Sequence, residues 1–216
     1  MSFTSDYEIY QPLSAIEAAS RFDTFFDVFG QRLQNEPGAP QRTITLLARS
    51  PASPAAQALA TNLCRFQPGT IAVGIIFAQI APVPALDYVV QAVRKSCMLS
   101  PELVIRWAKN RALLDAHERL TLGHSLSWTG DSMRRTEDTR SAMDRVDSGN
   151  PFMFAEAKAS FSAMWKASVP LPKPAFANPA IGRPAMTAGG PARIEASPFV
   201  KQNIVRLEEY LRGRRH

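Results

Sequence analysis

The segment from Asp115 to Arg135 contains the side chains of this sequence that are best suited to chemistry on a phosphate group. His117 lies two positions before Arg119. A histidine can act as a nucleophile or as a general acid, and an arginine can hold a phosphate through two parallel hydrogen bonds. The segment therefore predicts either a phosphodiester site at His117 or, alternatively, an ordinary strand-end histidine with a structural hydrogen bond.

Two further arginines, Arg134 and Arg135, close the same segment. Together with Arg119 they are candidates for a phosphate-binding patch. The alternative is a solvated loop in which these arginines pair with nearby acids such as Glu137 and Asp138. Local charge neutrality favours the solvated loop.

The cysteines and histidines show none of the spacings that are typical of a metal site. Cys64 and Cys97 both fall in segments that are predicted to be helical and apolar. Two buried thiols in a reducing compartment are therefore expected rather than a disulfide. We expect no metal and no other cofactor.

Charge is unevenly distributed along the chain. The formal net charge is +6, but residues 1–150 hold 15 Lys and Arg against 15 Asp and Glu, so the excess lies in residues 151–216. Residues 1–10 include Asp6 and Glu8 and no apolar run, which argues against a secretory signal there. No stretch reaches the ~18 consecutive apolar residues that would span a bilayer. The sequence predicts a cytoplasmic protein without a transmembrane segment.

Helix and strand patterns alternate through the first half of the chain. Ser14 and Glu17 form a capping box, and the helix after it carries an aromatic stripe that predicts packing onto the protein's own sheet. Ser53 before Pro54 marks the start of another helix. A third helix is predicted from one apolar face, which consists of Leu86, Val89, Val90, Val93 and Cys97.

Each of these helices is followed by a segment that is predicted to be a strand: Thr43–Arg49, Thr70–Ile80 and Glu102–Ala108. This alternation of strands and helices is typical of right-handed crossovers and parallel pairing. A hairpin is predicted next from Glu118–Gly123 and Leu126–Trp128, so the sheet becomes mixed. Residues 134–150 are predicted to be a loop or a solvated helix, and a helix with an apolar face from Phe154 to Val169 closes the domain. The fold class is therefore α/β, with a mixed, mainly parallel sheet flanked by helices.

The composition changes after residue 169. Residues 170–198 contain seven of the 17 prolines and almost no large apolar side chains, which predicts a disordered, flexible linker. Residues 199–216 are predicted to be an amphipathic docking helix, because apolar side chains recur there at steps of four, three and four: Val200, Ile204, Leu207 and Leu211. The predicted organisation is thus a domain over 1–169, a linker over 170–198 and a helix over 199–216.

With these elements around it, the hairpin resembles the phospholipase D-like superfamily, whose repeat unit ends in the motif H-x-K-x4-D-x6-G-S-x-N. The similarity covers roughly residues 43–169, which is one repeat of the two that build an active site. His117, Arg119 and Gly130 fall near the family's histidine, lysine and glycine positions. The resemblance implies a phospholipase D-like α/β repeat.

The motif is degenerate. His124 occupies the aspartate position and Met133 the asparagine position, and the hairpin is one residue short. In the family, a histidine from each repeat does the chemistry while lysine and asparagine groups hold the phosphate. Met133 cannot donate a hydrogen bond, so the resemblance implies that His117 is vestigial or a nucleophile that needs a second copy. It also implies that Arg119 can bind an anion without turnover.

The sequence is compatible with three functions. The first is a non-catalytic protein-interaction or adaptor protein, which captures a protein partner through the tethered C-terminal helix. The second is a homodimeric phosphodiesterase or nuclease in which His117 of each chain meets across a two-fold axis. The third is binding of anionic lipid or nucleic acid through the basic tail. Glu208 and Glu209 on the same helix favour a protein partner.

Overall fold

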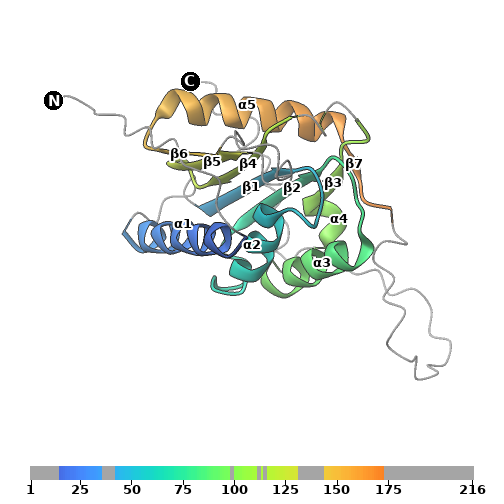
Figure 1. Ribbon diagram of the computed structural model, residues 1–216, viewed down its shortest axis with the longest axis horizontal. Coiled ribbons are helices and arrows are strands. Elements are labelled where there is room, and N and C mark those ends of the chain that lie inside the picture. Colours follow the sequence, from blue (N-terminus) through green and yellow to red (C-terminus); the bar gives the residue numbers. More distant parts are fainter. Residues whose placement is uncertain are drawn as a thin grey trace.

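The computed structural model describes residues 15–35, 42–97, 100–110, 113, 116–130 and 144–172, which form a seven-stranded mixed sheet with helices on both faces (Figure 1). The helices are α1 Ala15–Asn35, α2 Pro54–Leu63, α3 Val83–Cys97, α4 Pro101–Val104 and α5 Pro151–Ala167. The strands are β1 Thr43–Ala48, β2 Ala72–Phe77, β3 Ile105–Trp107, β4 Glu118–Leu122, β5 Leu126–Gly130, β6 Asp144–Ser148 and β7 Val169–Pro170. The predicted α/β class is confirmed.

The strand order across the sheet is β6-β5-β4-β1-β2-β3-β7. β1 pairs with β2 and β2 with β3 in parallel, as the alternation of strands and helices predicts. The other four pairings are antiparallel. The sheet is therefore mixed, but it is not mainly parallel, because four of its six pairings are antiparallel. Two of these four involve the edge strands β6 and β7, which were not predicted from the sequence.

β1 and β2 occupy the centre of the sheet, where helices cover both faces. Every residue of these two strands is buried. The crossover between them begins at the predicted helix start, where Ser53 Oγ accepts a hydrogen bond from the backbone amide of Ala56 at 3.2 Å. Pro54 follows at the first turn, where it removes no needed donor.

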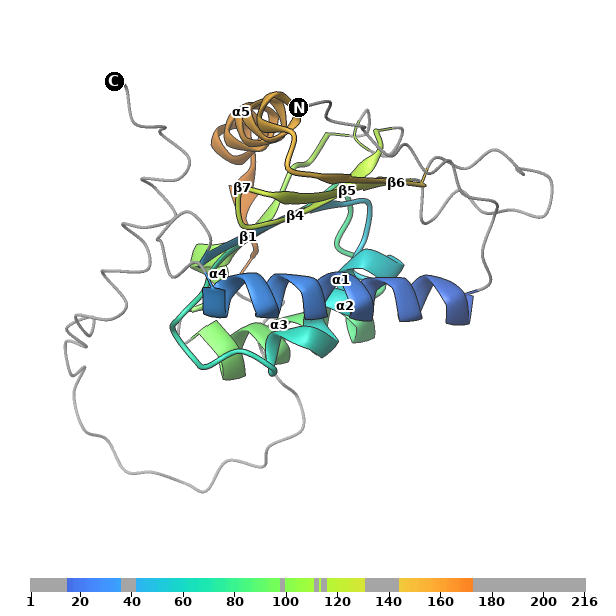
Figure 2. The same ribbon diagram turned by 90° about the vertical axis from the view of Figure 1, so that its left-hand side faces the viewer.

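The two faces of the sheet are covered by different helices (Figure 2). α1, α2 and α3 lie on one face and α5 lies on the other. The aromatic side chains of α1 pack against the chain's own sheet and α2 region, as predicted: Phe22 meets Trp128 edge-on, with ring centroids 5.0 Å apart, and Phe29 meets Phe66 in the same way. The buried residues of α3 are the five apolar residues that define its predicted face.

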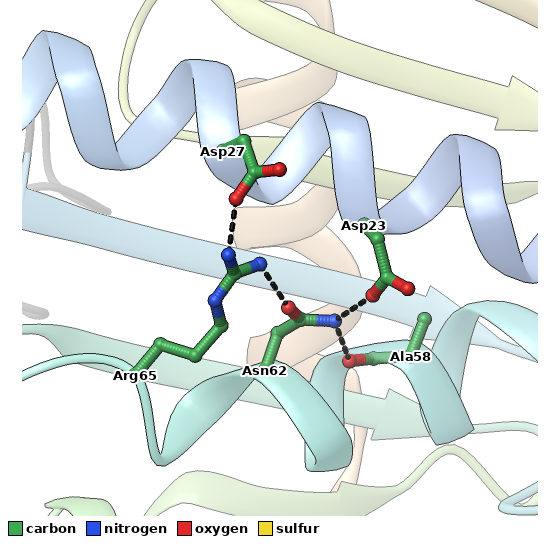
Figure 3. A network of polar contacts seen from close by, with 5 residues as sticks. All are labelled: Asp23, Asp27, Ala58, Asn62 and Arg65. Atoms are coloured by element: carbon green, nitrogen blue, oxygen red, sulfur yellow. Dashed lines mark hydrogen bonds and ion pairs between the residues drawn. The ribbon is translucent and has the colours of Figure 1, made fainter.

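A polar network fastens α1 to α2 beside this apolar contact (Figure 3). The Arg65 guanidinium forms an ion pair with Asp27 and donates to Asn62 Oδ1. The Asn62 amide donates in turn to Asp23 and to the carbonyl of Ala58. Asn62 is almost completely buried, so the network satisfies its polar atoms and fixes the position of α1 over α2.

Two predictions about the last third of the domain are wrong. Asp144–Ser148 is the strand β6, where a loop or solvated helix was predicted. α5 ends at Ala167, and Val169 continues into β7, whose Pro170 pairs with Arg106. Leu171, which falls in the predicted linker, is buried as well.

The two cysteines differ in their surroundings. Cys97 is buried on α3, as predicted, but Cys64 is exposed just after the end of α2. Both are free thiols. No helix in the described part of the chain has the length and apolarity that crossing a bilayer requires. The capping residue Ser14, the remainder of the predicted linker and the predicted terminal helix lie outside the described residues.

Candidate functional site

His117 directly precedes β4, at the edge of the sheet where β1 ends and β4 begins. Leu47 of β1 is opposite Arg119 of β4, so Arg49, which follows β1 directly, is level with His117. The His117 side chain is exposed. The carboxyl ends of β1 and β2 meet at this edge, which is where open α/β sheets commonly place their sites.

The residue between His117 and Arg119 has a structural role. Glu118 is 1% exposed, and its Oε1 accepts a hydrogen bond from the backbone amide of Arg49 at 3.0 Å. The Arg49 guanidinium donates to the carbonyl of Ala116, also at 3.0 Å. These two contacts bind the start of β4 to the end of β1, and they hold the backbone on both sides of His117 in place.

Strand alternation determines which face of the sheet each side chain of β4 occupies. Leu120 and Leu122 belong to the large apolar cluster under α1, α2 and α3. Arg119 and Thr121 therefore face α5, and the same period of two places His117 on the α5 side. The predicted nucleophile and the predicted phosphate ligand thus share one face.

Arg119 belongs to a cross-strand row that we call the arginine row, which consists of Arg119, Thr129 and Arg145. The register places Arg119 opposite Thr129, and Thr129 opposite Arg145. Arg145 is held by Asp147, whose Oδ1 accepts from Nε at 3.0 Å and from Nη2 at 2.8 Å. The Arg119 side chain is half-buried, and its guanidinium forms no hydrogen bond or ion pair with any other described residue. Its guanidinium is therefore available to an anion.

Two more cations, one on β3 and one on α5, are partly buried. Arg106 of β3 donates to the carbonyl of Ser168 at 3.0 Å, and its guanidinium carbon lies 5.0 Å from the centroid of the Trp165 ring. Lys158 of α5 is half-buried. Burial lowers the pKa of both side chains, because the charged forms lose contact with water. Both side chains are therefore cations that are partly shielded from water.

His124 is remote from His117. It is exposed in the turn Gly123–Ser125, which joins β4 to β5 at the opposite edge of the sheet. The five residues of β4 separate the two histidines, and a strand of that length spans about 17 Å. The imidazoles of His117 and His124 therefore cannot act on the same phosphate.

A groove also lies at that opposite edge, between α1 and the segments before β1 and β2. It has a volume of about 610 Å³, and its walls include Phe66, Arg42, Thr70 and the Asp27–Arg65 ion pair. Neither His117 nor Arg119, the predicted site residues that the structure describes, lines it. The groove and His117 are consequently separate features.

Several predicted site residues lie outside the described part of the chain. These are the phosphate-ligand candidates Arg134 and Arg135 and the partner-binding residues Val200, Ile204, Leu207 and Leu211. Met133 also lies outside it. Among the residues that are described, no group of three or more His, Cys, Asp or Glu side chains is arranged to hold a metal ion.

Sequence reasoning missed Arg49, Glu118 and Arg145 as neighbours of the site. Glu118 lies inside the motif, but its partner Arg49 is 69 positions away, so only the β1–β4 register brings the two together. Arg145 could be placed in the arginine row only by recognising β6. The available signal was the position of Arg49 as the last residue of a predicted strand.

Comparison with solved structures finds a similarity to the crystal structure of Nuc, a phospholipase D family member from Salmonella typhimurium. The TM-score is 0.49 at 13% sequence identity, and the similarity covers 77% of this chain and 99% of that chain. Nuc belongs to the family that the hairpin residues resemble. No protein-family model matches the sequence, and the search of curated proteins finds no match.

Proposed function

We propose that this chain is a non-catalytic protein-interaction protein, an adaptor in which the α/β domain is a rigid scaffold and residues 199–216 capture a protein partner. In this proposal His117 is vestigial. Arg119 keeps the ability to bind a phosphate group, with Arg134 and Arg135 as candidate helpers. The separation of the histidines is the observation that carries the proposal.

Phosphodiester chemistry through a covalent intermediate needs a nucleophile and an acid on opposite sides of one phosphorus atom. His117 has no second described histidine near it, because His124 lies at the far end of β4. The neighbouring acid, Glu118, is buried and accepts a hydrogen bond from the Arg49 backbone. Among the described residues, the second histidine is therefore too far from His117 for the two to act together on one phosphate.

Anion binding is supported by Arg119. The arginine lies on the same face as His117, is half-buried, and has no described partner that would compete with an anion. Thr129 is opposite Arg119 and offers a hydroxyl in the same row. A guanidinium that is already partly desolvated loses less solvation when it binds two oxygens of a phosphate through parallel hydrogen bonds.

Titration with inorganic phosphate tests the anion site. Wild type is expected to bind phosphate, and Arg119→Ala to lower the affinity by at least about tenfold, which corresponds to about 1.4 kcal/mol. Lys95→Ala is the matched control, since Lys95 is an exposed cation on α3, on the other face of the sheet. Equal affinities for wild type and Arg119→Ala would contradict a phosphate site at Arg119.

Partner capture by the tail is tested with three versions of the chain. Pull-downs are expected to retain a protein partner with the full chain and to lose it when residues 199–216 are removed. The double variant Leu207→Asp, Leu211→Asp keeps every basic residue of the tail but disrupts its apolar spacing, so it should also lose the partner. Capture that survives this double variant and falls steeply with salt would instead indicate a polyanion on the basic tail.

A further inference from the structure

β6 forms one margin of the sheet (Figure 2). Among the described residues, its ladder hydrogen bonds go to β5 alone. The opposite edge of β6 therefore presents backbone N–H and C=O groups that can pair with another strand. Its central side chain, Val146, is 47% exposed.

The sequence of β6, Asp-Arg-Val-Asp-Ser, is complementary to itself in one arrangement. If two copies pair antiparallel with Val146 opposite the partner's Val146, Arg145 lies opposite the partner's Asp147, and Asp147 lies opposite the partner's Arg145. Directly opposite side chains of unlike charge stabilise an antiparallel pair, and like charges destabilise it. The arrangement therefore gains two cross-strand ion pairs.

Other arrangements of the same strand are disfavoured. Parallel pairing of the two strands in register would place Arg145 beside the partner's Arg145. Antiparallel pairing centred on Arg145 or on Asp147 would oppose two like charges at the centre. Charges on an edge strand usually prevent pairing with other chains, and here they select a single register.

In this arrangement each face of one sheet would also continue into the same face of the partner's sheet. Val146 is opposite Trp128 of β5, so it lies on the apolar side of the sheet. Pairing with the partner's Val146 would extend that apolar row and remove exposed apolar surface from water. Arg145 and Asp147 lie on the α5 side, where they already form an ion pair with each other. The paired strands would join these two ion pairs into an alternating cluster of four charges.

We propose that two copies of this chain dimerise by antiparallel pairing of β6 about a two-fold axis at Val146. This inference stands independently of the proposed function. It is carried by the edge of β6 that no described strand pairs with, the exposure of Val146 and the charge order of Arg145 and Asp147.

The proposed dimer keeps the two copies of His117 apart. The registers β4–β5 and β5–β6 place Glu118, Gly130 and Asp144 at the same edge of the sheet, so His117 lies at the Asp144 end of β6. In the antiparallel dimer, the partner's His117 lies at the opposite edge. Five strand spacings of about 4.8 Å also separate the two β4 strands, a lateral distance of about 24 Å. This dimer is therefore incompatible with a shared phosphodiester site built from two copies of His117.

Disulfide trapping tests this arrangement directly. In a Cys64→Ser background, which removes the exposed native thiol, Val146→Cys is expected to form a covalent dimer on mild oxidation. Directly opposite residues of antiparallel strands have Cα atoms about 4.5–5.5 Å apart, which suits a disulfide. His117→Cys and Phe152→Cys, the latter on the 84% exposed Phe152, are matched controls that should stay monomeric on denaturing gels. Cross-linking of His117→Cys but not of Val146→Cys would overturn the proposal.

Sedimentation equilibrium of the full chain provides a second readout that needs no cysteine. Wild type is expected to be a dimer at micromolar concentration, and Arg145→Asp to weaken the dimer at least about tenfold, because it opposes two acids on each side of the axis. The double variant Arg145→Asp, Asp147→Arg restores unlike pairs and should recover dimerisation. A monomeric wild type, or a double variant no better than Arg145→Asp while equally folded by circular dichroism, would contradict pairing through β6.

Discussion

The two faces of this sheet differ in chemistry although the same strands form both. On the face under α1, α2 and α3, the strands contribute large apolar side chains such as Ile44, Leu46 and Leu120, each 0% exposed. On the α5 face, one cross-strand row consists of polar side chains, which we call the polar row: Thr45, Thr121, Ser127 and Asp147. All four are buried.

The difference indicates a division of roles between the faces. Burial of apolar surface is the main favourable term in folding, so the α1–α3 face supplies most of the stability. The α5 face has only a small apolar cluster, Leu47, Ile76 and Phe161. It carries instead the residues suited to binding, Arg119 and His117. Alternation along β4 thus lets one strand serve both purposes.

The largest effect is expected from paired substitutions on β1, where neighbouring residues face opposite sides. Leu46→Ala on the apolar face should lower the free energy of unfolding by about 2–5 kcal/mol, through lost burial and a cavity. Thr45→Val in the polar row should change it by less than about 1.5 kcal/mol, because the replacement has nearly the same shape. Urea unfolding measures both. Equal losses would contradict the division of roles.

The pH dependence of stability that Cys97 causes is a second test of the difference between the two faces. Burial on the apolar face raises the pKa of its thiol from 9.0 to about 12. The unfolded chain therefore ionises this thiol above pH 9, while the folded chain keeps it protonated until about pH 12. The contribution of Cys97 to stability is complete below pH 9 and is lost as the pH rises from there to about 12.

Urea unfolding between pH 8 and 11 tests this expectation. Wild type should lose more stability over the range than Cys97→Ala, which has no thiol to ionise. Cys64, which is exposed, should react rapidly with a thiol reagent in both proteins, while Cys97 should react only on unfolding. Rapid reaction of two thiols in the folded wild type would contradict the burial of Cys97.

Glu118 is expected to have an intermediate effect. Glu118→Ala leaves the Arg49 amide without its acceptor in a buried position, so the free energy of unfolding should fall by about 1.5–3 kcal/mol. Glu156→Ala, at an exposed position of α5, is the control and should change it by less than about 0.5 kcal/mol. If the two variants are equally stable, the Glu118–Arg49 contact does not hold β4 to β1.

The smallest effect on stability is expected at Arg119. Because this side chain has no described hydrogen-bond or ion-pair partner, Arg119→Ala should change the free energy of unfolding by less than about 0.5 kcal/mol. Thermal unfolding with added phosphate separates stability from binding. Phosphate should raise the Tm of wild type and leave that of Arg119→Ala unchanged. A large loss of stability without phosphate would assign Arg119 a structural role.

Strongly apolar elements could be predicted from the sequence, and strands at the margins could not. β1, β2 and the buried face of α3 have patterns that only burial explains, and the structure agrees with them. β6 has one apolar residue, Val146, among charged and polar ones, so its pattern resembles a solvated loop. β7 has two residues, and one is a proline that begins a proline-rich segment. Neither edge strand has a periodicity to detect.

The candidate site likewise has one part that could be predicted from the sequence and one part that could not. The proximity of His117 and Arg119 follows from their spacing of two residues in the sequence, which local reasoning detects. The contact of Glu118 with Arg49 and the row that joins Arg119 to Arg145 depend on pairing between distant segments. No local pattern contains that information, because register is fixed by the packing of the whole sheet.

The account depends most directly on the absence of turnover at His117. Purified wild type and His117→Ala should be incubated with bis(p-nitrophenyl) phosphate, and released nitrophenolate measured against a buffer blank. The account predicts that both proteins match the blank, while wild type still binds inorganic phosphate through Arg119. Release by wild type that His117→Ala abolishes would contradict a non-catalytic domain.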